Sequence, residues 1–335
     1  MPPDSIRIRR PAHSHRLMHG LMFVATFCWA ANIVAVKEGL TGFSASALTQ
    51  LRVAGAAALF ATIYFIHHGR PRFRLTRREW GFMALVAMSG VTFNQLFFIS
   101  GVGRSSVAHA GLIVALGPVM VLVLSCLLRL EALTVPKFVG MLISFAGVAI
   151  LTFAKGAHGN GSYWKGDLIL LAGSAVFAYY TILVKEAADR FDAVTLNGIA
   201  YVLGLMLLIP FAGRSLLDVQ WKSVPFAGWW GLGFAVVFGS VVPYLIFAVV
   251  MTELTAARVA AFAYLQPVIA TGLGIWLLQE TLTLKIILGG ILIIAGVYIT
   301  ERERGEEAAE LIPAEGGPQV ASAARAQRPT SILSP

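Results

Sequence analysis

Two stretches of 27 residues decide the fold: AHAGLIVALGPVMVLVLSCLLRLEALT at 108–134 and ARVAAFAYLQPVIATGLGIWLLQETLT at 257–283. The second begins 149 residues after the first, and at that offset a mid-segment proline, a terminal glutamate and a Leu-Thr pair coincide. Glycines beyond these stretches coincide as well: Gly140 with Gly289 and Gly147 with Gly296. Agreement of so many uncommon features at one offset is not expected by chance. We therefore predict two homologous halves.

The composition around these stretches is that of a membrane protein. Of the 335 residues, 57% are hydrophobic and 13% are charged, and the mean hydropathy is +0.76. A water-soluble domain carries about 25% charged residues. Apolar runs of about 20 residues, the length of a membrane-spanning helix, recur along the chain. Ten such runs are visible: 17–36, 45–66, 80–100, 107–128, 135–153, 167–185, 193–213, 225–251, 257–278 and 284–300. They predict an all-α integral membrane protein with ten transmembrane helices and no separate soluble domain.

The runs divide the chain into five parts. A basic cytoplasmic leader at 1–16 precedes the first repeat of five helices at 17–153. An outer loop at 154–166 leads to the second repeat at 167–300. The tail at 301–335 is rich in Ala, Gly, Pro and Ser, and we expect it to be disordered because it has little apolar surface to bury.

The positive charges predict the orientation. If the N-terminus is cytoplasmic, 18 of the 26 Lys and Arg residues fall on the cytoplasmic side and seven on the other, while Arg52 lies inside a span. By the positive-inside rule both termini are then cytoplasmic, in a cell or inner membrane. The net charge of +9 thus indicates topology rather than binding to nucleic acid. Cys28 and Cys126 lie in apolar runs and form neither a disulfide framework nor a zinc site.

Five helices per half make the repeat an inverted one, because an odd number of spans brings the second half into the membrane from the opposite side. Inverted repeats are typical of transporters, in which a site near the midplane lies between two halves that rock against each other. We therefore expect alternating access around a central site.

The repeat also resembles a known family. Its features are Trp29 and Lys37 in the first helix, Leu51-Arg52 in the second, the Leu-x-Pro motif at 116–118, and a Glu-x-Leu-Thr turn before a glycine-bearing helix. Together they resemble the EamA repeat of the drug/metabolite transporter (DMT) superfamily, over residues 17 to 300. The resemblance implies a ten-helix carrier of small metabolites, often an exporter of amino acids or related compounds. The sixth helix departs from the pattern because Phe177 replaces the tryptophan. No motif identifies the cargo.

Polar and aromatic side chains within the spans predict the substrate cavity. They should face the interior of the bundle, because lipid offers them no hydrogen bonds. The predicted substrate-binding residues are Trp29, Asn32, Asn94, Gln95, Tyr180, Tyr244, Tyr264 and Gln266. Asn94-Gln95 and Pro243-Tyr244 coincide at the 149-residue offset. Aromatic faces with a few amides suit a small, partly apolar solute. The alternative is that these groups only bond one helix to another.

Four further residues are predicted to act at a hinge or gate: Pro118, Pro267, His109 and Arg258. Each proline lies mid-span and frees the carbonyl four residues before it, which must find a partner or line a wet cavity. The alternative for the prolines is a kink healed by a neighbouring helix.

Three charged residues have structural interpretations. Arg52 lies about two turns into its helix, where it either has a functional role or bonds to backbone carbonyls or to Glu38; we favour the bonding role, because the family that the repeat resembles often has Arg at this position. Glu131 and Glu280 end equivalent helices on opposite membrane faces, so they serve as caps or hinge contacts rather than as a catalytic pair.

No Asp or Glu lies deep in a span, which bears on the cargo. Exporters that trade cationic drugs for protons usually need an embedded carboxylate. We therefore predict a transporter of small neutral or zwitterionic, amino-acid-like metabolites; the alternatives are a proton-coupled drug or cation efflux pump, a channel, or an intramembrane enzyme. No catalytic motif, cofactor site or metal site is recognisable, so no enzyme is predicted. The expected partners are the small-molecule substrate and the lipid bilayer, not nucleic acid, with the chain as a monomer or homodimer.

Overall fold

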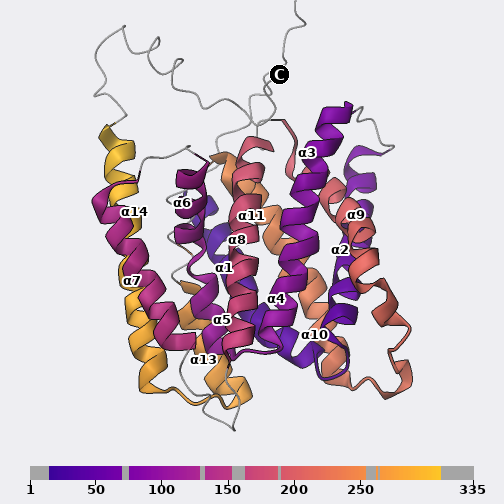
Figure 1. Ribbon diagram of the computed structural model, residues 1–335. Coiled ribbons are helices and arrows are strands. Elements are labelled where there is room, and N and C mark those ends of the chain that lie inside the picture. Colours follow the sequence, from indigo (N-terminus) through magenta and orange to yellow (C-terminus); the bar gives the residue numbers. More distant parts are fainter. Residues whose placement is uncertain are drawn as a thin grey trace, which may run out of the picture.

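The computed structural model describes residues 15–69, 75–128, 133–152, 163–187, 190–253, 262 and 265–310 (Figure 1). Within these ranges the secondary structure is helical and contains no strand. The first half contains α1 (His15–Gly39), α2 (Ala45–His68), α3 (Arg77–Ala87), the π-helical turn η1 (Met88–Phe93), α4 (Asn94–Val102), α5 (Val107–Val114), α6 (Gly117–Leu127) and α7 (Val135–Thr152). The second half contains α8 (Trp164–Ala187), α9 (Ala193–Ala212), the 3₁₀ turns η2 (Gly213–Leu216) and η3 (Trp221–Ser223), α10 (Phe226–Val236), the π-helical turn η4 (Val237–Val241), α11 (Val242–Glu253), α13 (Leu265–Leu278) and α14 (Leu284–Glu310).

The helices form one upright bundle, in which α3, η1 and α4 join into a single span, as do α10, η4 and α11 (Figure 1). Seven segments are long and apolar enough to cross a membrane: Arg16–Gly39, Ala45–His68, Arg77–Val102, Val107–Leu127, Trp164–Ala187, Ala193–Leu216 and Phe226–Thr252. Three shorter apolar helices accompany them: Val135–Ile150, Leu265–Leu278 and Leu284–Gly296. These ten segments correspond to the ten predicted runs, which confirms the all-α fold class.

Local signals in the sequence explain where several helices begin. Ser44 and Thr76 accept hydrogen bonds from backbone N–H groups of α2 and α3, and Glu79 completes a capping box with Thr76. Asp192 caps α9 by accepting from the N–H groups of Val194 and Thr195. Burial raises the pKa of Asp192, but these bonds and the nearby His68 outweigh that effect and leave it below its ordinary value.

Glycines allow α7 and α14 to pack against each other along one flank of the bundle (Figure 1). A Cβ on Gly147 would lie 2.7 Å from the carbonyl oxygen of Gly289, and one on Gly296 would meet the carbonyl oxygen of Gly140. These four glycines therefore meet crosswise between the two halves, Gly147 against Gly289 and Gly296 against Gly140. Small residues permit such close contact between membrane helices.

The two π-helical turns occupy equivalent positions, since Met88 and Val237 are 149 residues apart. A π-helical turn leaves a backbone carbonyl without its usual partner, and such turns are frequent at functional sites. In η1 the carbonyl of Gly90 accepts a hydrogen bond from the Tyr244 hydroxyl at 3.2 Å. In η4 the carbonyl of Gly239 accepts one from Nη2 of Arg52 at 2.8 Å. Each half therefore bonds to the other at its π-helical turn.

The structure corrects one prediction about the tail. Residues 301–310, which we expected to be disordered, continue α14 as a helix to Glu310. The segment ERERGEEAAE is rich in Glu, Arg and Ala, which have high helix propensity and extend a helix already formed in the membrane. The rest of the predicted tail lies outside the described residues.

Candidate functional site

A cavity of about 100 Å³ lies between the two halves of the bundle. Its walls come from α1, α2, α4, the junction of α5 and α6, α8, α11 and α13. The lining residues are Trp29, Asn32, Ile33, Arg52, Asn94, Gln95, Phe98, Val114, Gly117, Leu170, Gly173, Ser174, Phe177, Tyr244 and Gln266. Six of the predicted substrate-binding residues are among them: Trp29, Asn32, Asn94, Gln95, Tyr244 and Gln266.

Three aromatic rings form one side of this cavity. The Trp29 ring meets the rings of Phe177 and Tyr244 edge to face, with centroids 6.1 and 6.0 Å apart. Trp29 and Phe177 occupy equivalent places in the two repeats, so the halves meet here through equivalent side chains. The rings offer apolar and π surface to a solute.

The Tyr244 hydroxyl holds two amide side chains in place. Nδ2 of Asn94 and Nε2 of Gln95 each donate a hydrogen bond to it at 3.1 Å, and the hydroxyl donates to the carbonyl of Gly90. The coincidence of Asn94-Gln95 with Pro243-Tyr244 thus corresponds to direct contact in space. A satisfied network of this kind fixes the rotamers of its members.

Arg52 contributes the positive charge of the cavity wall. Its side chain donates from Nε to Oγ of Ser240 at 2.9 Å and from Nη2 to the carbonyl of Gly239 at 2.8 Å. The predicted bond to a backbone carbonyl is present, and its acceptor lies in the other half. The guanidinium carbon lies 5.8 Å from the centre of the Phe98 ring.

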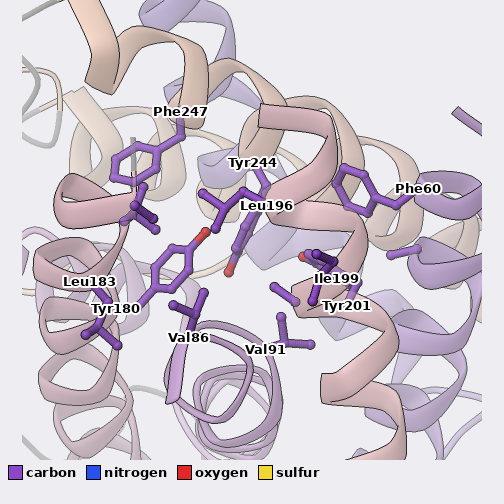
Figure 2. Close-up of a cluster of buried hydrophobic side chains, with 14 of the residues drawn as sticks. Phe60, Val86, Val91, Tyr180, Leu183, Leu196, Ile199, Tyr201, Tyr244 and Phe247 are labelled. Carbon is purple, nitrogen blue, oxygen red and sulfur yellow. The ribbon is translucent and has the colours of Figure 1, made fainter. Parts of the chain in front are cut away.

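Tyr180 is placed differently from its prediction. It is 1% exposed and does not line the cavity; it belongs to the hydrophobic cluster of Figure 2, where it points toward Tyr244, with Val86 and Leu183 nearby. The reason is Gly90, where a Cβ would collide with the Tyr180 ring. The glycine leaves a space that the ring fills, so Tyr180 supports the cavity from behind.

The hinge candidates have different surroundings. Pro118 lies at a break in the fourth span, because α5 ends at Val114 and α6 begins at Gly117. Both of these end residues line the cavity, as expected if Pro118 exposes backbone there. Pro267 lies in the first turn of α13 and is buried. Three residues singled out from the sequence lie outside the described residues: Arg258, Tyr264 and Glu131.

His109 belongs to a group of bonds that joins the halves at one end of the bundle, which we call the sealed end. Its Nδ1 lies 2.9 Å from Oδ2 of Asp167 at the start of α8, and the two side chains are 2% and 0% exposed. Ser105 donates from Oγ to the other oxygen of Asp167, and its own carbonyl accepts from Nζ of Lys37. The first half is therefore tied to α8 through a buried acid.

Glu280 adds a second tie at the sealed end. Its carboxylate accepts from the backbone N–H groups of Val107 at 2.7 Å and Ala108 at 3.1 Å. Glu280 thus caps α5, a helix of the opposite half, in agreement with the cap or hinge contact predicted for it from the sequence. Burial, followed by the negative charges of Glu280 and Asp167, raises the pKa of the neighbouring Tyr163, so its phenol stays neutral.

Both halves of the chain match one known protein family. The EamA-like transporter family matches residues 16–153 and again residues 164–302. The chain belongs to the EamA-like transporter family. It is therefore a transporter of the DMT superfamily, as the resemblance of its repeat predicted.

Individual relatives agree with this assignment. An uncharacterized transporter of Archaeoglobus fulgidus is 28% identical over 289 residues, which are 85% of this chain and 98% of that protein. A protein of Streptantibioticus cattleyicolor named "probable terminal-alkyne amino-acid exporter" is 23% identical over 275 residues, 82% of this chain and 90% of that one. A protein of known crystal structure aligns with this chain with a TM-score of 0.56, and the alignment covers 85% of this chain and 96% of the other. The two sequences are 18% identical, so this likeness supports the fold alone.

Several residues of this EamA-like transporter site were not predicted to belong to it. Phe177 had a usable signal, since it is the repeat equivalent of Trp29. Asp167 looked like an ordinary acid at a helix start, and its burial beside His109 depends on how α5 and α8 pack. Among the described residues no group of three His, Cys, Asp or Glu could hold a metal ion.

Proposed function

We propose that this EamA-like transporter exports a small neutral or zwitterionic, amino-acid-like metabolite across the cell membrane by alternating access between its two halves. The observation that carries the proposal is the cavity between the halves, which combines an aromatic wall with the amides of Asn32, Asn94 and Gln266. Such a lining suits a small solute with an apolar part and a few hydrogen-bonding groups. The name of the Streptantibioticus cattleyicolor relative is consistent with amino acid export.

Counterflow into proteoliposomes tests this function. The purified protein would be reconstituted with a panel of amino acids, sugars and nucleosides, and the exchange of labelled solute would be measured. Saturable counterflow of at least one amino acid is expected. Saturable exchange of sugars or nucleosides alone would refute the proposed substrate class.

Trp29→Ala is expected to reduce counterflow about tenfold. The substitution removes apolar surface against which the solute packs, and burial of such a side chain contributes about 1.5–3 kcal/mol. The measurement is the counterflow rate together with the melting temperature of the purified variant. Trp276→Ala is the control, since Trp276 is 72% exposed on α13. If both variants transport like the wild type, the aromatic wall does not contact the solute.

The proposed topology has both termini cytoplasmic, with the sealed end on the outer side. A cysteine placed at Gly159 is expected to react with a membrane-impermeant maleimide added from outside, and one placed at Arg72 is not. The measurement is labelling of intact cells with Cys28 and Cys126 replaced by serine. The opposite pattern of labelling would reverse the orientation.

A second candidate function is proton-coupled efflux of a cationic drug. The observation in its favour is the buried pair of His109 and Asp167, which places a carboxylate inside the bundle, where such exporters need one. Accumulation of a quaternary ammonium dye in vesicles, driven by an imposed pH gradient, would support this candidate. Counterflow of an amino acid that does not depend on the gradient would support the first.

A further inference from the structure

Arg52 carries a buried positive charge that the described part of the protein does not neutralise. The side chain is 2% exposed within the span Ala45–His68. Its two bonding partners, the Ser240 hydroxyl and the Gly239 carbonyl, are both uncharged. No ion pair between Arg52 and a carboxylate occurs among the described residues. A charge inside a membrane protein normally pairs with an opposite charge or marks a substrate pathway.

One nitrogen of this guanidinium is free to bind something else. Nη1 is buried and has no hydrogen-bond partner among the described residues, although a buried charged donor without a partner is strongly unfavourable. Arg52 lines the cavity, so an occupant would meet it there. The bonds to Ser240 and Gly239 fix the orientation of the guanidinium before any occupant arrives.

Two more polar atoms of the cavity residues lack partners within the described part of the chain. They are Oδ1 of Asn32 and Oε1 of Gln266, both hydrogen-bond acceptors. A Cβ on Gly239 would meet Oδ1 of Asn32 and would lie 3.0 Å from Nη2 of Arg52, so the first acceptor lies beside the guanidinium. The residues that line the cavity therefore carry an unpaired cationic donor and two unpaired neutral acceptors, together with the rings of Trp29 and Phe177.

We propose that Arg52 is the carboxylate-binding residue of the substrate site, so that the cargo must carry a carboxylate. The guanidinium is its counter-ion, with Nη1 as the donor that bonds to it. Arginine suits this role because its planar fork matches a carboxylate. The acceptors of Asn32 and Gln266, with the aromatic wall, receive the ammonium group of an α-amino acid. This inference rests on the proposed function and narrows its substrate class.

Ligand-dependent thermal stabilisation of the purified full-length protein tests the assignment. A ligand that binds the folded state raises the melting temperature according to its affinity. The probes are L-leucine; L-leucinamide, which lacks the carboxylate; and 4-methylpentanoate, which lacks the ammonium group. Sodium chloride serves as a simple anion. We expect L-leucine to bind about tenfold more tightly than its amide, the difference made by one charge-assisted hydrogen bond. We also expect 4-methylpentanoate to bind and chloride not to bind.

Arg52→Gln should remove this preference, so that L-leucine and L-leucinamide bind equally weakly. Arg104→Gln is the matched control, because Arg104 is exposed and bonds only to the carbonyl of Ser100 among the contacts described. If Arg52→Gln fails to fold, the relative affinities of the wild-type protein for L-leucine and L-leucinamide still decide whether the site binds a carboxylate. Equal binding of the two, stabilisation by chloride, or no stabilisation by any probe would overturn the assignment.

Failure of this inference can be told apart from failure of the proposed function. Suppose that L-leucine and 4-methylpentanoate both bind the wild-type protein but no amino acid shows counterflow. The carboxylate site then stands, and amino acid export is refuted. If an amino acid shows counterflow but its amide binds as tightly, export stands and the role of Arg52 is refuted.

Discussion

Asp167→Ala is expected to open the sealed end and to destabilise the sealed conformation by about 1–3 kcal/mol for each buried group that loses its hydrogen-bond acceptor. His109 and Ser105 both bond to this carboxylate, and both would be left buried without their acceptor. Asp167→Asn should have a smaller effect, because its amide oxygen can still accept from Ser105. The first half would then be held to α8 by fewer bonds.

The measurement is the reaction of a cysteine at Ser174, on the cavity wall, with a membrane-impermeant maleimide added from the sealed end. Cys28 and Cys126 would be replaced by serine first. The alanine variant should react much faster than the parent protein. Asp192→Ala is the control, since it removes a helix cap worth about 1 kcal/mol and should leave labelling unchanged. Unchanged labelling of the Asp167 variant would show that this pair does not close the cavity.

Gly239→Ala is expected to abolish substrate binding by adding a single methyl group. The new Cβ would collide with Oδ1 of Asn32 and press against Nη2 of Arg52. Overpacking of this kind costs about 1–3 kcal/mol, and here it displaces two cavity residues together. Counterflow should fall to background, with a modest drop in melting temperature.

Gly233→Ala is the matched control for this substitution. It lies on the same span, in α10. Apart from its chain neighbours and the adjacent backbone of its own helix, none of the described residues places an atom within 4 Å of the position that its new methyl group would take. Alanine there should be neutral or slightly stabilising, by up to about 1 kcal/mol, because it raises helix propensity. Wild-type counterflow in the Gly239 variant would show that the contact among η4, Asn32 and Arg52 is not required.

Much of the fold could be predicted from one offset in the sequence. The coincidence of Asn94-Gln95 with Pro243-Tyr244 anticipated residues that prove to be hydrogen-bonded, and the coincident glycines anticipated the packing of α7 on α14. Gln95 bonds directly to its equivalent Tyr244, whereas the glycines meet crosswise, Gly147 with Gly289 and Gly296 with Gly140. In both cases the coincident residues of one half contact those of the other.

The rest depended on packing that no periodicity reveals. The bond from Arg52 to Gly239 requires a π-helical turn, which has no clear sequence signal here. The burial of Asp167 requires α8 to begin against α5. Tyr180 is an aromatic residue of the kind expected in the cavity, but its ring packs against Gly90 in the hydrophobic cluster behind the cavity wall. The sequence therefore indicated which polar groups face inward more reliably than it indicated which of them reach the cavity.

The matching π-helical turns also bear on the history of the chain. A π turn holds one residue more than the α turn it replaces, so each corresponds to a single-residue insertion into a helix. Both turns begin at equivalent positions, Met88 and Val237. One insertion in an ancestral five-helix protein, before its gene was duplicated and fused, accounts for both.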